Sequence, residues 1–144
     1  PTVFGEDYKY EYGKADVIKE GNDVTIAATG IMVYEALEAA KILETEDINA
    51  EVISVNTIKP IDAETILTSV KKTKCVVTCE NNNIKGGLYS VVSELLCSNY
   101  PTICAPIGVN DEFGQVGKYS DLLKAYKLTS QDIAQKVKEV IKKK

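Results

Sequence analysis

The chain has 144 residues, of which 44% are hydrophobic and 26% are charged, and its 17 basic and 21 acidic side chains give a net charge of −4. That length suits a single domain with a core of its own. Every basic residue is Lys, and the chain contains no Arg, His or Trp. These absences exclude a catalytic group or a metal site that depends on His, and any Arg clamp on a phosphate. The acidic balance also argues against nucleic acid as a partner.

The four cysteines are predicted to be small buried hydrophobic residues with free thiols: Cys75, Cys79, Cys97 and Cys104. Cys75 and Cys79 share one face of a β-branched run but stand roughly 13 Å apart along a strand, too far for a disulfide or a shared metal. Free thiols fit a reducing compartment, and the sequence contains no apolar stretch of 18 residues and no signal-peptide pattern. We therefore expect a cytoplasmic protein with no membrane association. The chain begins at Pro1 rather than Met, which indicates a segment of a longer product.

Residues 1–14 are polar and rich in acidic residues and Tyr, and they are predicted to be a lead-in linker before one domain at residues 15–144. Short β-branched runs predict five strands, at Ala15–Lys19, Val24–Ala28, Ala50–Val55, Cys75–Cys79 and Thr102–Ile107. Amphipathic segments predict helices after Thr29-Gly30, from Asp62, from Gly86-Gly87, at Asp121–Tyr126 and from Thr129.

This alternation indicates an α/β fold with three layers, α/β/α, around a five-stranded, mostly parallel mixed sheet. The short turn at residues 20–23 leaves no room for a crossover helix. The first strand is therefore the one that can run antiparallel.

Three segments are expected to meet past the carboxyl ends of the strands, where open α/β sheets bind ligands: Thr29-Gly30, Glu80–Gly87 and Gly108–Gly117. Each offers backbone N–H groups at or near a helix N-terminus, as an anion site does. The same glycines are also typical of tight turns and close helix–sheet packing, and the residues leave both interpretations open.

The carboxylates in these segments are equally ambiguous. Glu80 follows a buried strand and precedes three Asn residues, and Asp111 and Glu112 precede Phe113-Gly114. Each could act on a ligand or organise its own loop through hydrogen bonds to the backbone. Without a nucleophile, a His base or a metal motif, we assign no catalytic, cofactor-binding or metal-binding residue.

The order of the motifs resembles the C-terminal domain of transketolases over about residues 14–141. The resemblance lies in Gly21–Gly30, Thr57–Asp62, Glu80 with Gly86-Gly87-Leu88, Gly108–Gly114 and Leu122–Thr129. Four residues depart from the family pattern: Asn82 stands where the family usually has His, Tyr89 and Lys127 where it has Gly, and Val116 where Ser is common.

The resemblance implies a part of an enzyme of the pentose phosphate pathway that moves a two-carbon ketol unit between sugar phosphates. Such enzymes use thiamine diphosphate and a divalent metal, Mg²⁺ or Ca²⁺, held between two preceding domains across a dimer interface. The implied partners are the N-terminal and middle transketolase domains or subunit and a second protomer. This domain would bind no cofactor itself and would serve packing and assembly. The alternatives are the same domain of 1-deoxyxylulose-5-phosphate synthase or of a 2-oxo-acid dehydrogenase E1 β subunit, or a module that binds a small anion or a regulatory ligand.

Overall fold

Five strands form one sheet in the computed structural model, which describes residues 1–144. The strands lie in the order β1-β3-β2-β4-β5, with β1 antiparallel to β3 and all other neighbours parallel. Their bounds are β1 Ala15–Lys19, β2 Val24–Ala28, β3 Ala50–Val55, β4 Cys75–Asn83 and β5 Ile103–Val109. The mostly parallel mixed sheet and the antiparallel first strand are both as predicted.

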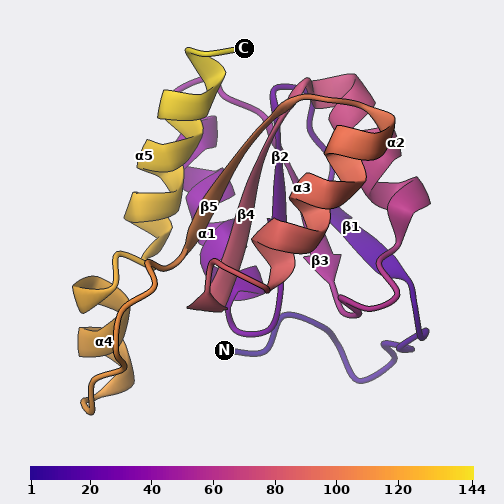
Figure 1. The fold of residues 1–144 in the computed structure, drawn as a ribbon. Helices are drawn as coiled ribbons and strands as arrows, with labels where there is room; N and C mark the ends of the chain where they lie inside the picture. Colours follow the sequence, from indigo (N-terminus) through magenta and orange to yellow (C-terminus); the bar gives the residue numbers. More distant parts are fainter.

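Helices cover both faces of this sheet (Figure 1). The helices are α1 Met32–Glu44, α2 Ala63–Thr73, α3 Leu88–Asn99, α4 Tyr119–Ala125 and α5 Ser130–Ile141. The α1 and α5 helices pack on one face, and α2 and α3 pack on the other. The short α4 lies beyond the end of the sheet, below α5 in Figure 1. The α/β/α arrangement of three layers is therefore confirmed.

Side-chain alternation along the central strands builds a core on each face. In β4, Cys75, Val77 and Cys79 face α1 and α5, whereas Val76 faces α2 and α3. All five residues of β2 are buried, as expected for a strand covered on both faces. The inference that Cys75 and Cys79 share one face is thus confirmed.

Two helix caps read from the sequence are present. The Asp62 carboxylate accepts a hydrogen bond from the backbone N–H of Thr65 at 3.2 Å and caps α2. Thr129 and Asp132 form a complete capping box at the start of α5. These side chains fix where the two helices begin.

The strand ends and two of the cysteines differ from the predictions. β4 continues past Cys79 to Asn83 and β5 continues to Val109, so that Gly108 belongs to a strand rather than to a loop. The extra pairing aligns Asn83 with Val109, and the Ile84 N–H donates to the Val109 carbonyl at 3.0 Å. The added β4 residues, Glu80–Asn83, are polar and show no strand pattern. Cys97 lies on the outer side of α3 and is exposed, and Cys104 is only partly buried. The prediction of four buried cysteines was wrong for these two.

Residues 1–14 form no helix or strand but make specific contacts with the domain. The Tyr8 hydroxyl donates to the Asp16 carboxylate at 2.6 Å, and the Gly13 N–H donates to Thr57 Oγ1 at 3.0 Å. Val3 packs against the core between the sheet and the helices α1 and α5. Among all the helices, none has the length and apolar character needed to span a bilayer.

Candidate functional site

The sheet has a topological switch point between its neighbouring strands β2 and β4. The chain leaves β2 for α1 on one face, and it leaves β4 for α3 on the opposite face. In open α/β sheets, ligands bind in the crevice that forms outside the carboxyl ends of two such strands.

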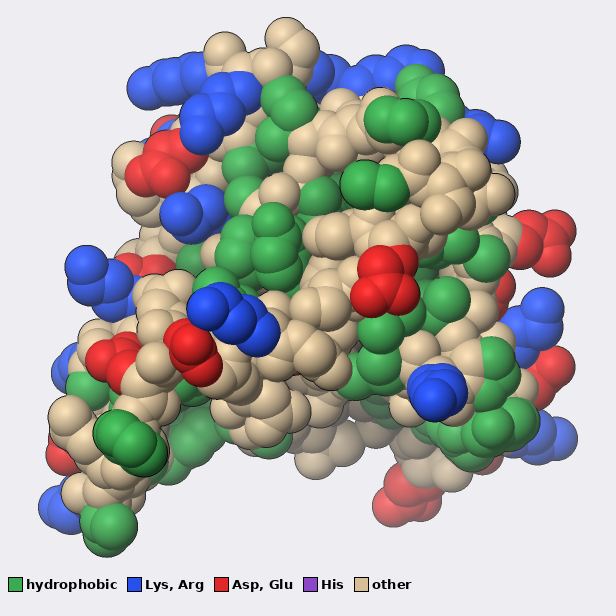
Figure 2. Space-filling model, in the orientation of Figure 1, with side chains coloured by type: hydrophobic (Ala, Val, Ile, Leu, Met, Phe, Trp, Pro, Cys, Tyr) green, Lys and Arg blue, Asp and Glu red, His purple; other side chains and the backbone are tan.

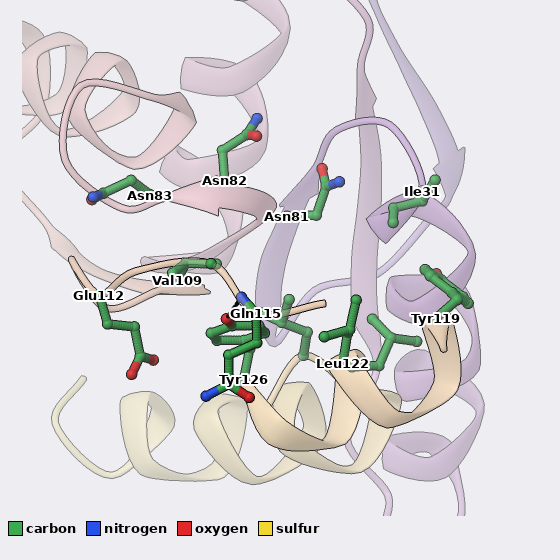
Figure 3. Close-up of a pocket in the computed structure, with 13 residues that line it drawn as sticks. Ile31, Asn81, Asn82, Asn83, Val109, Glu112, Gln115, Tyr119, Leu122 and Tyr126 are labelled. Carbon is green, nitrogen blue, oxygen red and sulfur yellow. Dashed lines mark hydrogen bonds between the residues drawn. The ribbon is translucent and has the colours of Figure 1, made fainter. Parts of the chain in front are cut away.

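A cavity of about 350 Å³ lies at this edge of the sheet (Figure 3). Its walls come from the β2–α1 turn, the end of β4, the end of β5 with the following loop, and α4 with the turn after it. Its thirteen lining residues are Ile31, Asn81, Asn82, Asn83, Val109, Glu112, Gly114, Gln115, Tyr119, Leu122, Leu123, Tyr126 and Leu128.

The three segments expected to converge do meet here. Ile31 follows Thr29-Gly30, and a Cβ placed on Gly30 would lie 4.0 Å from Asn81 Oδ1. The segments Glu80–Gly87 and Gly108–Gly117 supply seven of the other lining residues. Sequence reasoning missed the wall formed by α4 and the turn after it. The signal available for it was the helical spacing of Tyr119, Leu122 and Tyr126.

Glu80 organises the loop rather than facing the cavity. Its side chain is fully buried and accepts hydrogen bonds from the backbone N–H groups of Leu88 at 2.9 Å and Tyr89 at 3.0 Å. The carboxylate therefore caps the first turn of α3 and interacts favourably with the helix dipole. Gly87 permits this approach, because a Cβ there would lie 2.0 Å from Glu80 Oε2. These backbone donors are consequently not free for an external anion.

Asp111 is also held by its own chain. It accepts hydrogen bonds from Asn83 Nδ2 at 2.8 Å and from Lys85 Nζ at 3.1 Å. The hydrogen bonds from Asn83 and then Lys85 lower the pKa of Asp111 below its ordinary value. The Asp111 backbone has a φ of 52°, so this contact fixes a tight bend at the start of the loop. Glu112 makes no such contact and lines the cavity.

The cavity wall is neutral apart from one carboxylate. Glu112 is the only charged residue among the thirteen, and the polar groups are mainly the side-chain amides of Asn81, Asn82, Asn83 and Gln115. The wall contains no Lys, so it offers no cation to a phosphate. Nowhere in the chain do three His, Cys, Asp or Glu side chains lie close enough together to hold a metal ion.

Comparison with known proteins places this chain among transketolase domains. The family model for the transketolase C-terminal domain matches residues 13–133. The 6-deoxy-6-sulfo-D-fructose transketolase subunit SqwH of Clostridium sp. (strain MSTE9) is 45% identical over 142 residues, which cover 99% of this chain and 44% of that protein. The 1-deoxy-D-xylulose-5-phosphate synthase of Dictyoglomus turgidum is 38% identical over 136 residues, which cover 92% of this chain and 22% of that protein.

A solved structure agrees with this placement. An inactive β4 tetramer of a split-gene transketolase superposes with a TM-score of 0.95 at 44% identity, over 99% of this chain and 46% of that one. The chain thus spans less than half the length of each of these three relatives. The family match over residues 13–133, the sequence relatives and the superposition agree, and the chain belongs to the transketolase C-terminal domain family.

Proposed function

We propose that this chain is the C-terminal domain of a thiamine-diphosphate-dependent transketolase, an enzyme that transfers a two-carbon ketol unit between sugar phosphates. The observation that supports this most directly is the 45% identity to a transketolase subunit along nearly the whole chain. The motif Gly108–Gly114 and the buried Glu80 that caps α3 belong to the same pattern.

The residues of this chain do not fit the cofactor. A diphosphate with its divalent metal needs several oxygen ligands placed together, and the cavity offers one isolated carboxylate, Glu112. The chain also contains no Arg or His, and the cavity wall contains no Lys. We therefore derive no catalytic step from this domain and propose that preceding domains hold thiamine diphosphate and the metal. The proposed role of this domain is packing and assembly.

The substrates are proposed as a class only. The SqwH relative is named for a sulfonated sugar, so we propose anionic sugars as the substrate class and no individual sugar phosphate. A second candidate is the corresponding domain of 1-deoxy-D-xylulose-5-phosphate synthase, which the 38% identity to that enzyme favours.

The test is an assay of the whole enzyme. The section that precedes this domain is combined with the chain in the presence of thiamine diphosphate and Mg²⁺, and a ketose phosphate and an aldose phosphate are supplied. We expect exchange of the two-carbon unit with both sections present and none with either alone. In a parallel sample, pyruvate replaces the ketose phosphate as the two-carbon donor and D-glyceraldehyde 3-phosphate is the acceptor. Formation of 1-deoxy-D-xylulose 5-phosphate with release of CO2 in that sample would support the second candidate, and no turnover in either sample would contradict the proposal.

A further inference from the structure

An apolar rim is formed by two residues that line the cavity and by two exposed residues of the loop that supplies part of its wall. We define this apolar rim as Ile31, Phe113, Val116 and Tyr119. Phe113 is 98% exposed and Val116 is fully exposed, while Ile31 and Tyr119 are about half exposed. Figure 2 shows hydrophobic side chains projecting at the lower left, where Figure 1 places the loop before α4. An exposed apolar patch of this kind on a water-soluble surface is typical of an interaction site.

The loop is held in a shape that presents these side chains outward. The Tyr126 hydroxyl accepts a hydrogen bond from the Gln115 N–H at 2.7 Å and donates one to the Phe113 carbonyl at 3.2 Å. Asp111, bonded to Asn83 and Lys85, fixes the other end. The exposure of Phe113 is therefore built into the fold, and docking would not require the loop to be ordered first.

The chemistry of this face fits a polypeptide better than a charged metabolite. The side-chain amides of Asn81 and Asn82 are exposed and make no hydrogen bond within the chain, so they can pair with backbone groups of a partner. Tyr119 lies beside Ile31 at one end of the cavity, and Glu112 lies at the other (Figure 3). The cavity wall, with neutral amides and a single carboxylate, resembles the centre of a protein interface, where charged residues are depleted, and the exposed Lys85–Asp111 ion pair lies outside that wall.

We propose that the apolar rim is the docking surface for the preceding section of the same enzyme, with Phe113 and Val116 as its anchors. This rests on the function proposed above. The chain spans only 44% and 46% of the two transketolase relatives, so more than half of each relative lies outside the matched domain and needs a surface to pack on. Phe113 and Val116 supply fully exposed apolar side chains for such a contact.

The test compares backbone hydrogen–deuterium exchange in the chain alone with exchange in the whole enzyme. The whole enzyme contains both sections, either covalently joined or as separate chains. We expect the backbone amides of residues 110–118 to exchange at least tenfold more slowly in the whole enzyme. The double variant Phe113→Ser with Val116→Ser is expected to lose this protection while keeping the urea midpoint of the wild-type chain. The matched control is Val17→Ser, an exposed apolar residue on β1 that lies outside the apolar rim, and it is expected to keep the protection.

Unchanged exchange across residues 110–118 in the whole enzyme would overturn the proposal. The proposal would also be overturned if the same residues were protected in the chain alone and lost this protection on dilution. A second copy of the chain would then be the partner that covers the apolar rim. The wild-type sample is assayed in parallel for ketol transfer. Turnover with an unprotected loop contradicts only the docking proposal, whereas protection without turnover contradicts only the proposed function.

Discussion

The position of the Glu80 carboxylate depends on the absence of a side chain at Gly87. The buried Glu80 carboxylate satisfies two N–H groups at the start of α3, and it reaches them because Gly87 has no side chain. A buried donor left without a partner costs about 1–3 kcal/mol. This pair therefore fixes both the entry into α3 and the direction of the Asn81–Asn83 segment that lines the cavity.

Gly87→Ala should destabilise the domain by at least about 2 kcal/mol, because the new Cβ would displace the Glu80 carboxylate from its donors. Urea denaturation followed by circular dichroism measures the effect. Gly5→Ala is the matched control, since nothing lies within 4 Å of a Cβ at that position, and its midpoint should not change. Equal stability of the two variants would contradict the assigned role of Glu80.

Cys97 should be the one thiol that reacts rapidly in the folded chain, since it is the only exposed cysteine. Burial raises the pKa of Cys104 to about 12, and it also raises the pKa values of Cys75 and Cys79, so that all three thiols stay protonated at pH 8. Cys75 and Cys79 are also buried from the reagent. A thiol reagent at pH 8 should count one fast group in the native chain and four in denaturant without reductant. Cys97→Ser should abolish the fast phase. A denatured count of two or fewer, or stoichiometric zinc by elemental analysis, would contradict the prediction of four free thiols.

Among the structural elements, α2 depends on Asp62 most clearly. Burial raises the pKa of Asp62, but hydrogen bonds from the backbone of Ala15 and from Thr65 outweigh burial and hold the pKa below its ordinary value. A carboxylate with a lowered pKa in the folded state contributes stability above its unfolded pKa of about 3.9 and loses it as the pH falls. The same side chain ties β1 to α2, because the Ala15 N–H donates to it at 3.0 Å.

Asp62→Ala should cost about 1–2 kcal/mol at pH 7 through the lost cap and the unpaired N–H of Ala15. The difference from wild type should shrink as the pH falls from about 5 to 3, because the wild-type carboxylate then takes up protons. Urea denaturation across this pH range measures both effects. Glu64→Gln, an exposed change in the same helix, should alter stability by less than about 0.5 kcal/mol at pH 7. A difference that grows at low pH would contradict the argument.

Elements defined by local patterns were predictable, and those defined by distant contacts were not. Val24–Ala28 and the Thr129 capping box follow from β-branched runs and cap spacing, and the structure places both as expected. The end of β4 depends on pairing of Asn83 with Val109, 26 residues further on, which no local pattern reveals. The same limit applies to the cavity: the meeting of the three segments that follow the central strands was predictable, but the position of α4 against them depends on tertiary packing.

For the whole molecule, the chain alone should not bind thiamine diphosphate. Its sequence lacks Arg and His, and the cavity at the switch point provides neither the cations nor the grouped oxygen ligands that a metal diphosphate requires. Calorimetric titration with thiamine diphosphate and Mg²⁺ should show no saturable heat up to millimolar concentration. The reconstituted whole enzyme is the positive control, and micromolar binding by the chain alone would contradict this assignment.

β5 forms an open edge of the sheet, and Pro106 lies within it, paired with Thr78 of β4. Proline has no N–H and is tolerated in a sheet where a strand has a free side. Pro106 therefore interrupts the row of backbone groups on which a further strand could grow. The β5 edge is consequently a poor template for the addition of a strand from another molecule, and β1 is the edge of the sheet at which its backbone groups are not interrupted by proline.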